Sequence, residues 1–199
     1  FQTVNEISAI KWITTNSRGD HLTTDTFIEG TSALSTSQLE TTEQRLREFR
    51  DEGRRVVAIT LSIGGNDLVS PGNQCARPPC NDLYFRERDA MKVRLDKIYS
   101  RINAAKDPST PLLVLLYYNA SDCGQRGVAS SPEELGVIGW NAAIREVAER
   151  HGAFLVDAYT PMRGKACSHL FDLDLNAQGN ALLAEQYEMV YESLPGEYR

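Results

Sequence analysis

The chain has 199 residues, of which 41% are apolar and 24% charged, the composition of an ordinary globular protein. That length suits a single domain over residues 1–199, large enough to bury a core without help from metals or many disulfides. The net charge of −6 argues against a nucleic-acid partner, because a phosphate backbone is bound by clustered Lys and Arg. The longest uncharged apolar run, Pro111–Tyr118, is far too short for a transmembrane segment.

Helices and strands are predicted to alternate. In chain order we expect a helix over Val4–Ile13, a short strand over Thr26–Glu29, a helix over Gln38–Phe49, a buried strand over Arg55–Ile63, a helix through Met91–Ile102, a buried strand over Pro111–Tyr118, a helix from Ser131 to about Arg150, a strand over Ala153–Asp157 and a last helix capped by Asn176. Strands separated by helices imply right-handed crossovers and a parallel sheet covered on both faces. The predicted fold class is therefore α/β.

All four cysteines lie in polar segments. Cys75 and Cys80 bracket a short loop, while Cys123 and Cys167 each follow a predicted strand. An even number with pairable spacing favours two disulfides and an exported protein, and four free thiols in a cytosolic enzyme is the alternative. No metal site is predicted, because there is no Cys-x-x-Cys pair and the three histidines are scattered.

Small and amide-bearing residues follow the predicted strands, where a parallel sheet binds its ligands. The segments are Gly30-Thr31-Ser32, Gly64-Gly65-Asn66-Asp67, Asn119-Ala120-Ser121-Asp122 and Ala158-Tyr159-Thr160-Pro161. Such residues suit a site that donates hydrogen bonds to an oxyanion, as ester hydrolysis requires. The alternative is structural: Gly30 as a strand-to-loop turn, and Asn66 and Asp67 as turn residues that bond the local backbone.

Two of these segments, together with residues 172–179, match sequence blocks of one family. Gly64-Gly65-Asn66-Asp67 matches G-x-N-D at every position, Gly30-Thr31-Ser32 is similar to a G-x-[ST]-S-like block, and residues 172–179 are similar to D-x-H-P-N-x-x-G. The chain thus resembles the SGNH (GDSL) serine ester hydrolases over nearly its whole length. The resemblance implies a flavodoxin-like three-layer α/β/α fold with a central parallel sheet, and no cofactor. It also implies an oxyanion hole formed by the Gly30 N–H and the Asn66 amide, supported by Gly64 and Asp67.

The family's nucleophile block, G-D-S-L, is not found. Its nearest echo, Gly19-Asp20-His21-Leu22, has His in place of Ser, and only residues 22–28 separate His21 from the end of the predicted strand at Glu29. A parallel crossover needs about a dozen residues, so we do not accept this echo, and Ser17 meets the same objection. We expect the first strand and its Ser to precede Phe1. Without that strand, Arg55–Ile63 would keep an unpaired buried edge.

The family's catalytic His is replaced as well. Aligning on Asn176 places Asp172 at the family's Asp and Asp174 at its His. A carboxylate, with an ordinary pKa of about 4, is a poor general base toward a serine hydroxyl. His169 is the one nearby imidazole, and we interpret it as a loop or surface histidine rather than a displaced base.

The leading hypothesis is a serine hydrolase acting on carboxylic esters: a lipase, an esterase or a carbohydrate deacetylase. Its partner would be a small-molecule, lipid or glycan ester. The alternative is a catalytically inactive module of the same fold that binds an ester or a glycan, which the missing Ser and Asp174 favour. The third hypothesis is an unrelated flavodoxin-like binding domain. Against it, the sequence lacks the Gly-rich phosphate loop of a nucleotide binder.

Overall fold

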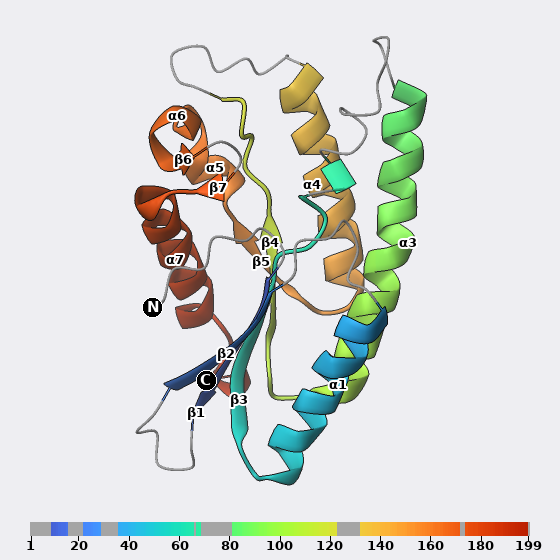
Figure 1. Ribbon diagram of the computed structural model, residues 1–199, viewed down its shortest axis with the longest axis vertical. Helices are drawn as coiled ribbons and strands as arrows, with labels where there is room; N and C mark the ends of the chain where they lie inside the picture. The colour runs from blue at the N-terminus through green and yellow to red at the C-terminus, as the bar shows by residue number, and fades with distance from the viewer. Residues whose placement is uncertain are drawn as a thin grey trace.

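A five-stranded sheet with the strand order β2-β1-β3-β4-β5 organises the fold (Figure 1). The computed structural model describes residues 9–15, 22–28, 36–65, 67–68, 81–122, 132–171 and 174–198, and only the backbone of residues 9–15, 22–28, 36–38, 132–135 and 174. The strands are β1 (Ala9–Thr15), β2 (Leu22–Ile28), β3 (Arg55–Leu61), β4 (Leu112–Leu116) and β5 (Phe154–Asp157).

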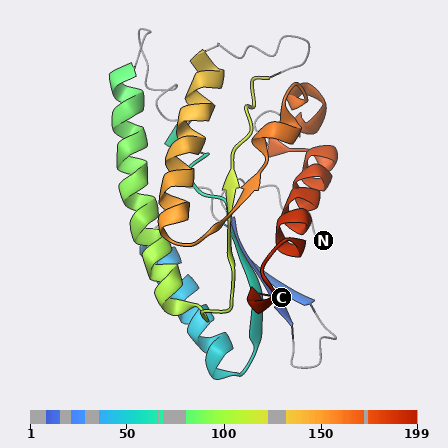
Figure 2. The ribbon, with the colours of Figure 1, turned by 180° about the vertical axis from the view of Figure 1, so that it is seen from behind.

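Helices cover the sheet on both faces. The long helices are α1 (Thr36–Asp51), α3 (Asn81–Ala105), α4 (Pro132–Arg150) and α7 (Ala177–Glu192). Figures 1 and 2 show α1, α3 and α4 on one side of the sheet and α7 on the other. Shorter elements precede and follow α7: α5 (Tyr159–Met162), α6 (Ala166–His169), the hairpin of β6 (Leu170–Phe171) and β7 (Asp174–Leu175), and a terminal 3-10 turn (Gly196–Tyr198). The predicted three-layer α/β/α fold is confirmed.

The parallel part of the sheet consists of β3, β4 and β5, the three strands predicted from apolar runs. All five residues of β4 are buried, because β4 has a neighbour on each edge and helices on each face. Burying one Leu or Val side chain contributes about 1.5–3 kcal/mol, so this strand is a main source of core stability. Among the described residues, no helix is both long and apolar enough to cross a bilayer.

The start of the chain differs from the prediction. Within the predicted helix Val4–Ile13, the described residues form β1, and residues 4–8 lie outside the described part. β1 pairs with β3 in antiparallel register, with Ile10 opposite Leu61 and Thr15 opposite Arg55. The expected unpaired edge of β3 is therefore wrong, because β1 supplies its backbone partner. The second position of the strand order thus holds an antiparallel strand.

Strand directions define two edges of the sheet. Because β1 is antiparallel to both β2 and β3, β2 runs in the same direction as β3, β4 and β5. We call the edge where these four strands end the carboxyl edge, and β1 begins there, with Ala9 opposite Ile28. At the other edge Thr15 lies opposite Leu22 and Arg55. The end of β1 at Thr15 and the start of β2 at Leu22 therefore lie at the edge opposite the carboxyl edge.

Candidate active site

The turn that follows β3 carries the G-x-N-D sequence to the carboxyl edge. Gly64 has a φ of +110°, a conformation that other residues adopt only with strain. Its carbonyl accepts hydrogen bonds from the Leu68 N–H at 3.1 Å and from the Trp140 indole at 2.9 Å. A glycine is required for space as well, because a Cβ at position 64 would lie 3.1 Å from the Met91 sulfur.

Asp67, the last residue of that motif, is held in a part-buried ion pair. Its side chain is 8% exposed, and its Oδ1 accepts a hydrogen bond from Arg94 of α3 at 2.6 Å. Burial raises the pKa of the Asp67 carboxyl, and the positive charge of Arg94 opposes that rise. The carboxylate therefore ties the turn to α3.

A second anchor lies just beyond β4. The Tyr117 backbone is bound at both polar groups by the Asn141 side chain, which accepts from its N–H at 2.8 Å and donates to its carbonyl at 2.7 Å. The Tyr117 hydroxyl lies 3.2 Å from Ser62 Oγ and accepts a hydrogen bond from the Gly65 N–H. Burial raises the pKa of Tyr117 to about 12, so this hydroxyl stays neutral and can donate. Tyr117 and Trp140 are both buried.

The acidic residues that follow β4 and β5 serve the backbone. Asp122 is buried, and its Oδ2 accepts from the Gly164 N–H at 2.7 Å. Asp157, the last residue of β5, accepts from the N–H groups of Tyr159 and Thr160 at 2.8 and 3.0 Å and so ties the start of α5 to the end of the strand. These contacts fold residues 158–166 back over the carboxyl ends of β4 and β5. Neither carboxylate is arranged as a reacting group.

The helix α6, which ends at His169, lies at this end of the molecule (Figure 1). Ser168 Oγ lies 3.0 Å from the Lys165 carbonyl oxygen and 2.7 Å from His169 Nδ1. When the hydroxyl donates to the carbonyl, the His169 Nδ1–H donates to Ser168 and Nε2 of the neutral ring carries the lone pair. Nε2 has no hydrogen-bond partner among the described residues. His169 is half-buried in a helix, which corrects its interpretation as a loop or surface residue.

The last sequence block forms the start of α7. The Asn176 side chain accepts from the N–H groups of Gln178 and Gly179 and donates to the Ser168 carbonyl at 2.8 Å, which confirms the predicted cap. A Cβ at Gly179 would collide with the His169 carbonyl oxygen, so the glycine lets α7 approach α6 closely. Asp174 begins β7, opposite Phe171. Asn176 and Gly179 of this block therefore hold α7 against α6.

A scan against protein families matches residues 15–182 to the GDSL-like lipase/acylhydrolase family. The chain belongs to this family. No curated protein sequence matches it significantly. Among solved structures, it is similar to an alpha/beta hydrolase enzyme from the metagenome of Lake Arreo in Spain, with 17% identity and a TM-score of 0.51 over 79% of this chain and 69% of the other. It is also similar to a catalytic mutant of an acetylxylan esterase from Geobacillus stearothermophilus, with 13% identity and a TM-score of 0.50 over 79% and 68%. At these identities the similarity shows a shared fold.

Several of the residues that the family resemblance picked out lie outside the described part of the chain. Gly30, Asn66 and Asp172 are among them, and Asp174 is described by its backbone alone. Gly64 and Asp67 lie at the carboxyl edge, in one short turn. The rejection of the Gly19–Leu22 echo agrees with the sheet, since Leu22 lies opposite Thr15 at the other edge. Within the described residues, no group of three or more His, Cys, Asp or Glu is arranged to hold a metal ion.

The cysteines are described only at Cys167. This residue lies in α6 and is disulfide-bonded, while Cys75, Cys80 and Cys123 lie outside the described residues. The predicted pair of disulfides and its connectivity therefore stay predictions.

Sequence reasoning did not find the residues that hold the motif in place. Trp140, Asn141 and Arg94 all contact the turn or its neighbour Tyr117. Only the residue types of Trp140 and Asn141 give an indication in the sequence. A Trp and an Asn in a largely apolar helix segment are expected to be buried and therefore hydrogen-bonded. Which partners they find is decided by the packing of α3 and α4 on the sheet.

Proposed function

We propose that the chain hydrolyses carboxylic esters with a serine nucleophile and an oxyanion hole. The observation that carries this proposal is the turn at Gly64–Leu68, placed at the carboxyl edge with a positive φ and anchored from α3, α4 and β4. In the proposal the Asn66 amide and the Gly30 N–H donate to the oxyanion. Membership of a family of lipases and acylhydrolases supports the reaction class.

The nucleophile of the proposal is a serine that precedes Ala9. β1 begins at the carboxyl edge, so a serine ahead of Ala9 is favoured over one that follows β1. Ser17 is disfavoured, because Thr15 ends β1 at the opposite edge. The sequence led us to expect the nucleophile on a first strand ahead of Phe1, and that expectation stays a prediction. The antiparallel direction of β1 adds Ser8 as a second candidate.

The general base of the proposal is His169. The expected base position holds Asp174, whereas α6 brings an imidazole with its Nε2 lone pair unbonded to this end of the sheet. Ser168 then orients the ring, the role that the family resemblance assigned to Asp172. A hydroxyl stabilises an imidazolium less than a carboxylate does, so we expect a slow esterase. Asp172 remains in the proposal as a nearby carboxylate that stabilises the charged ring.

The direct test is hydrolysis of p-nitrophenyl acetate and butyrate by the purified protein. Removal of one oxyanion donor costs about 10²–10³-fold in kcat, so Asn66→Ala should lose most of the activity. A matched control is Asn103→Ala, which removes an amide on α3 that bonds only the His151 carbonyl. Wild-type activity no higher than that of Asn66→Ala would contradict the proposal.

A fluorophosphonate probe followed by peptide mapping identifies the nucleophile without assuming its position. Labelling of a serine ahead of Ala9 would support the assignment, and labelling of Ser62, Ser168 or another serine would overturn it. An unlabelled protein that still binds acetylated oligosaccharides would favour the non-catalytic module, for which Asp174 at the histidine position is the supporting observation.

We also propose that the protein is exported. Four cysteines are present and Cys167 is in a disulfide bond, which oxidising compartments favour. Alkylation of the denatured protein should add no label before reduction and four labels after it. Label on any cysteine before reduction would contradict two disulfides.

A further inference from the structure

The turn at Gly64–Leu68 is held from three separate elements, and one of the three contacts acts on its first peptide group. Arg94 of α3 binds the Asp67 carboxylate, Tyr117 after β4 accepts from the Gly65 N–H, and Trp140 of α4 donates to the Gly64 carbonyl. The first two contacts bind residues on either side of position 66. The third contact holds the carbonyl of Gly64, the residue with the positive φ.

Among the described residues, the Trp140 indole N–H has one hydrogen-bond partner, the Gly64 carbonyl. The Trp140 side chain is 0% exposed, and a buried indole N–H left without an acceptor costs about 1–3 kcal/mol. Its nitrogen lies 2.9 Å from the Gly64 oxygen, and a Cβ on Gly64 would lie 3.6 Å from that nitrogen. The contact therefore combines a hydrogen bond with close packing against the glycine. Any shift of the indole would move the peptide plane between Gly64 and Gly65.

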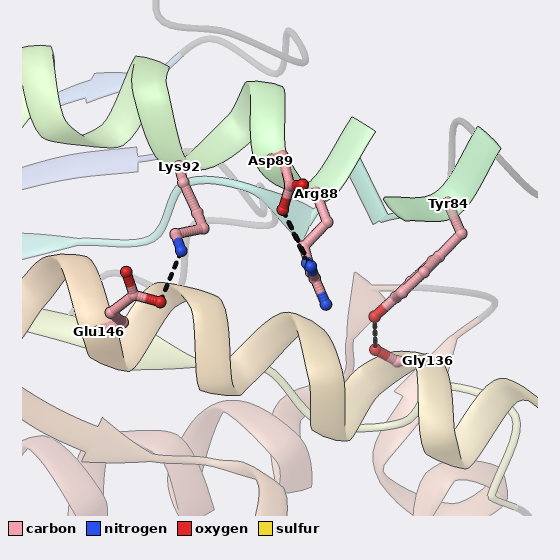
Figure 3. A network of polar contacts seen from close by, with 6 residues as sticks. All are labelled: Tyr84, Arg88, Asp89, Lys92, Gly136 and Glu146. Carbon is pink, nitrogen blue, oxygen red and sulfur yellow. Dashed lines mark hydrogen bonds and ion pairs between the residues drawn. The ribbon is translucent and has the colours of Figure 1, made fainter. Parts of the chain in front are cut away.

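The indole itself is braced by Tyr84, in the first turn of α3. Their ring centroids are 5.6 Å apart, and the Tyr84 hydroxyl donates to the Gly136 carbonyl on α4 at 2.5 Å. Figure 3 shows this bond at one end of the α3–α4 contact and the Lys92–Glu146 ion pair, at 2.6 Å, further along the same two helices. A Cβ at Gly139 would lie 2.9 Å from the Tyr84 hydroxyl, so the glycine at this position of α4 leaves room for the tyrosine.

We propose that Trp140 is a positioning residue for oxyanion stabilisation: its indole N–H fixes the Gly64 carbonyl and thereby sets the donor at position 66. The inference rests on the proposed function, because it takes Asn66 as that donor. An oxyanion donor has to be held to within about 0.5 Å, and a single turn on a strand end needs outside contacts to achieve this. Trp140 acts through the backbone and does not touch the substrate.

The test replaces the indole N–H while keeping the ring. A benzothienyl side chain at position 140 has sulfur in place of N–H and almost the same shape, and Trp140→Phe is the simpler second variant. We expect kcat on p-nitrophenyl acetate to fall roughly 10-fold to 100-fold, the effect of misplacing a reacting group. KM should stay within about twofold, since the lost interaction acts in the transition state. In an Asn66→Ala background the same replacement should cost less than about twofold.

The matched control is Val147→Ala, two turns further along α4 and also 0% exposed. It should lower the unfolding midpoint with kcat unchanged, which separates loss of stability from loss of positioning. Backbone hydrogen exchange of residues 62–68 gives a readout that needs no activity: it should accelerate in both Trp140 variants and not in Val147→Ala. Unchanged exchange there, or an unchanged kcat in an active protein, would overturn the inference. A wild-type protein without esterase activity would overturn the proposed function instead, and exchange would still report on the contact.

Discussion

The Asn141 side chain offers the sharpest energetic test of how the site is held. It is 8% exposed, and its amide satisfies both backbone polar groups of Tyr117, one residue beyond β4. Asn141→Leu keeps the number and branching of the side-chain heavy atoms and removes both bonds. A buried backbone group without a partner costs about 1–3 kcal/mol, so the pair should cost about 4 kcal/mol. For a chain of this size that corresponds to a Tm lower by roughly 8–16 °C.

Urea unfolding followed by far-UV circular dichroism measures this cost, with an unchanged m-value as the check on two-state behaviour. Asn103→Leu is the matched control, because Asn103 makes a single bond, to the His151 carbonyl at 2.9 Å, from a half-buried site. It should cost about 1 kcal/mol. If both variants lost the same free energy of unfolding, the two-bond clamp would contribute nothing beyond one ordinary hydrogen bond.

Asn141→Asp tests the same clamp by charge. The new carboxyl can accept from the Tyr117 N–H, but it must be protonated to donate to the Tyr117 carbonyl. Burial should therefore raise its pKa in the folded state above the unfolded value. A raised folded pKa contributes stability that is fully present below the unfolded pKa and is lost as pH rises through the folded pKa. The variant should accordingly be less destabilised, relative to the wild type, at pH 4 than at pH 8, and a flat difference would refute the geometry.

Three further predictions concern other parts of the fold. Gly179→Ala should destabilise the protein by about 3 kcal/mol in thermal unfolding, because its Cβ would collide with the His169 carbonyl, whereas Gly136→Ala, at a helical position where the Cβ would make ordinary contact with the Tyr84 ring, should be neutral or stabilising. Hydrogen bonding by Arg101 lowers the pKa of Glu43, so the cost of Glu43→Gln, about 1 kcal/mol at pH 7, should shrink as pH falls through that lowered pKa. His169→Gln should reduce kcat/KM about 10²–10⁴-fold and abolish the acid limb of the pH–rate profile. A preserved acid limb would exclude His169 as the base.

Local signals carried most of the fold. The runs at Arg55–Ile63 and Pro111–Tyr118 predicted two central strands, because a strand buried on both faces has to be apolar throughout. Asn176 was recognisable as a helix cap from its place before an apolar-periodic segment, and its side chain accepts two N–H groups in the structure. These elements depend on neighbours a few residues away.

The helix predicted over Val4–Ile13 was wrong for the residues that form β1. Apolar residues at Val4, Ile7, Ile10 and Ile13 gave a helical period, but β1 begins only at Ala9. Over Ala9–Thr15 the β-branched and aromatic content favours a strand. The competing physical requirement was the edge of β3, which needs backbone partners, and β1 meets that requirement. Pairing with a strand that is distant in sequence does not show in the hydrophobic period of the segment that pairs.

The site shows the same division. Gly64 and Asp67 were identifiable because the motif is contiguous in sequence, whereas Trp140 lies 76 residues from its partner Gly64, and Arg94 lies 27 residues from Asp67. Contacts at such separations depend on how α3 and α4 pack on the sheet. A motif therefore names the chemistry of a site, and the residues that give it precision have to come from the three-dimensional arrangement.

The reversed direction of β1 has a consequence for catalysis. A nucleophile carried at the end of a parallel first strand would follow that strand, but the chain after β1 leaves the sheet at the edge opposite the G-x-N-D turn. Only the segment that leads into Ala9 meets the carboxyl edge from this strand. The reversed direction of β1 therefore favours a nucleophile ahead of this strand over one behind it. The peptide that a fluorophosphonate labels decides between these two arrangements.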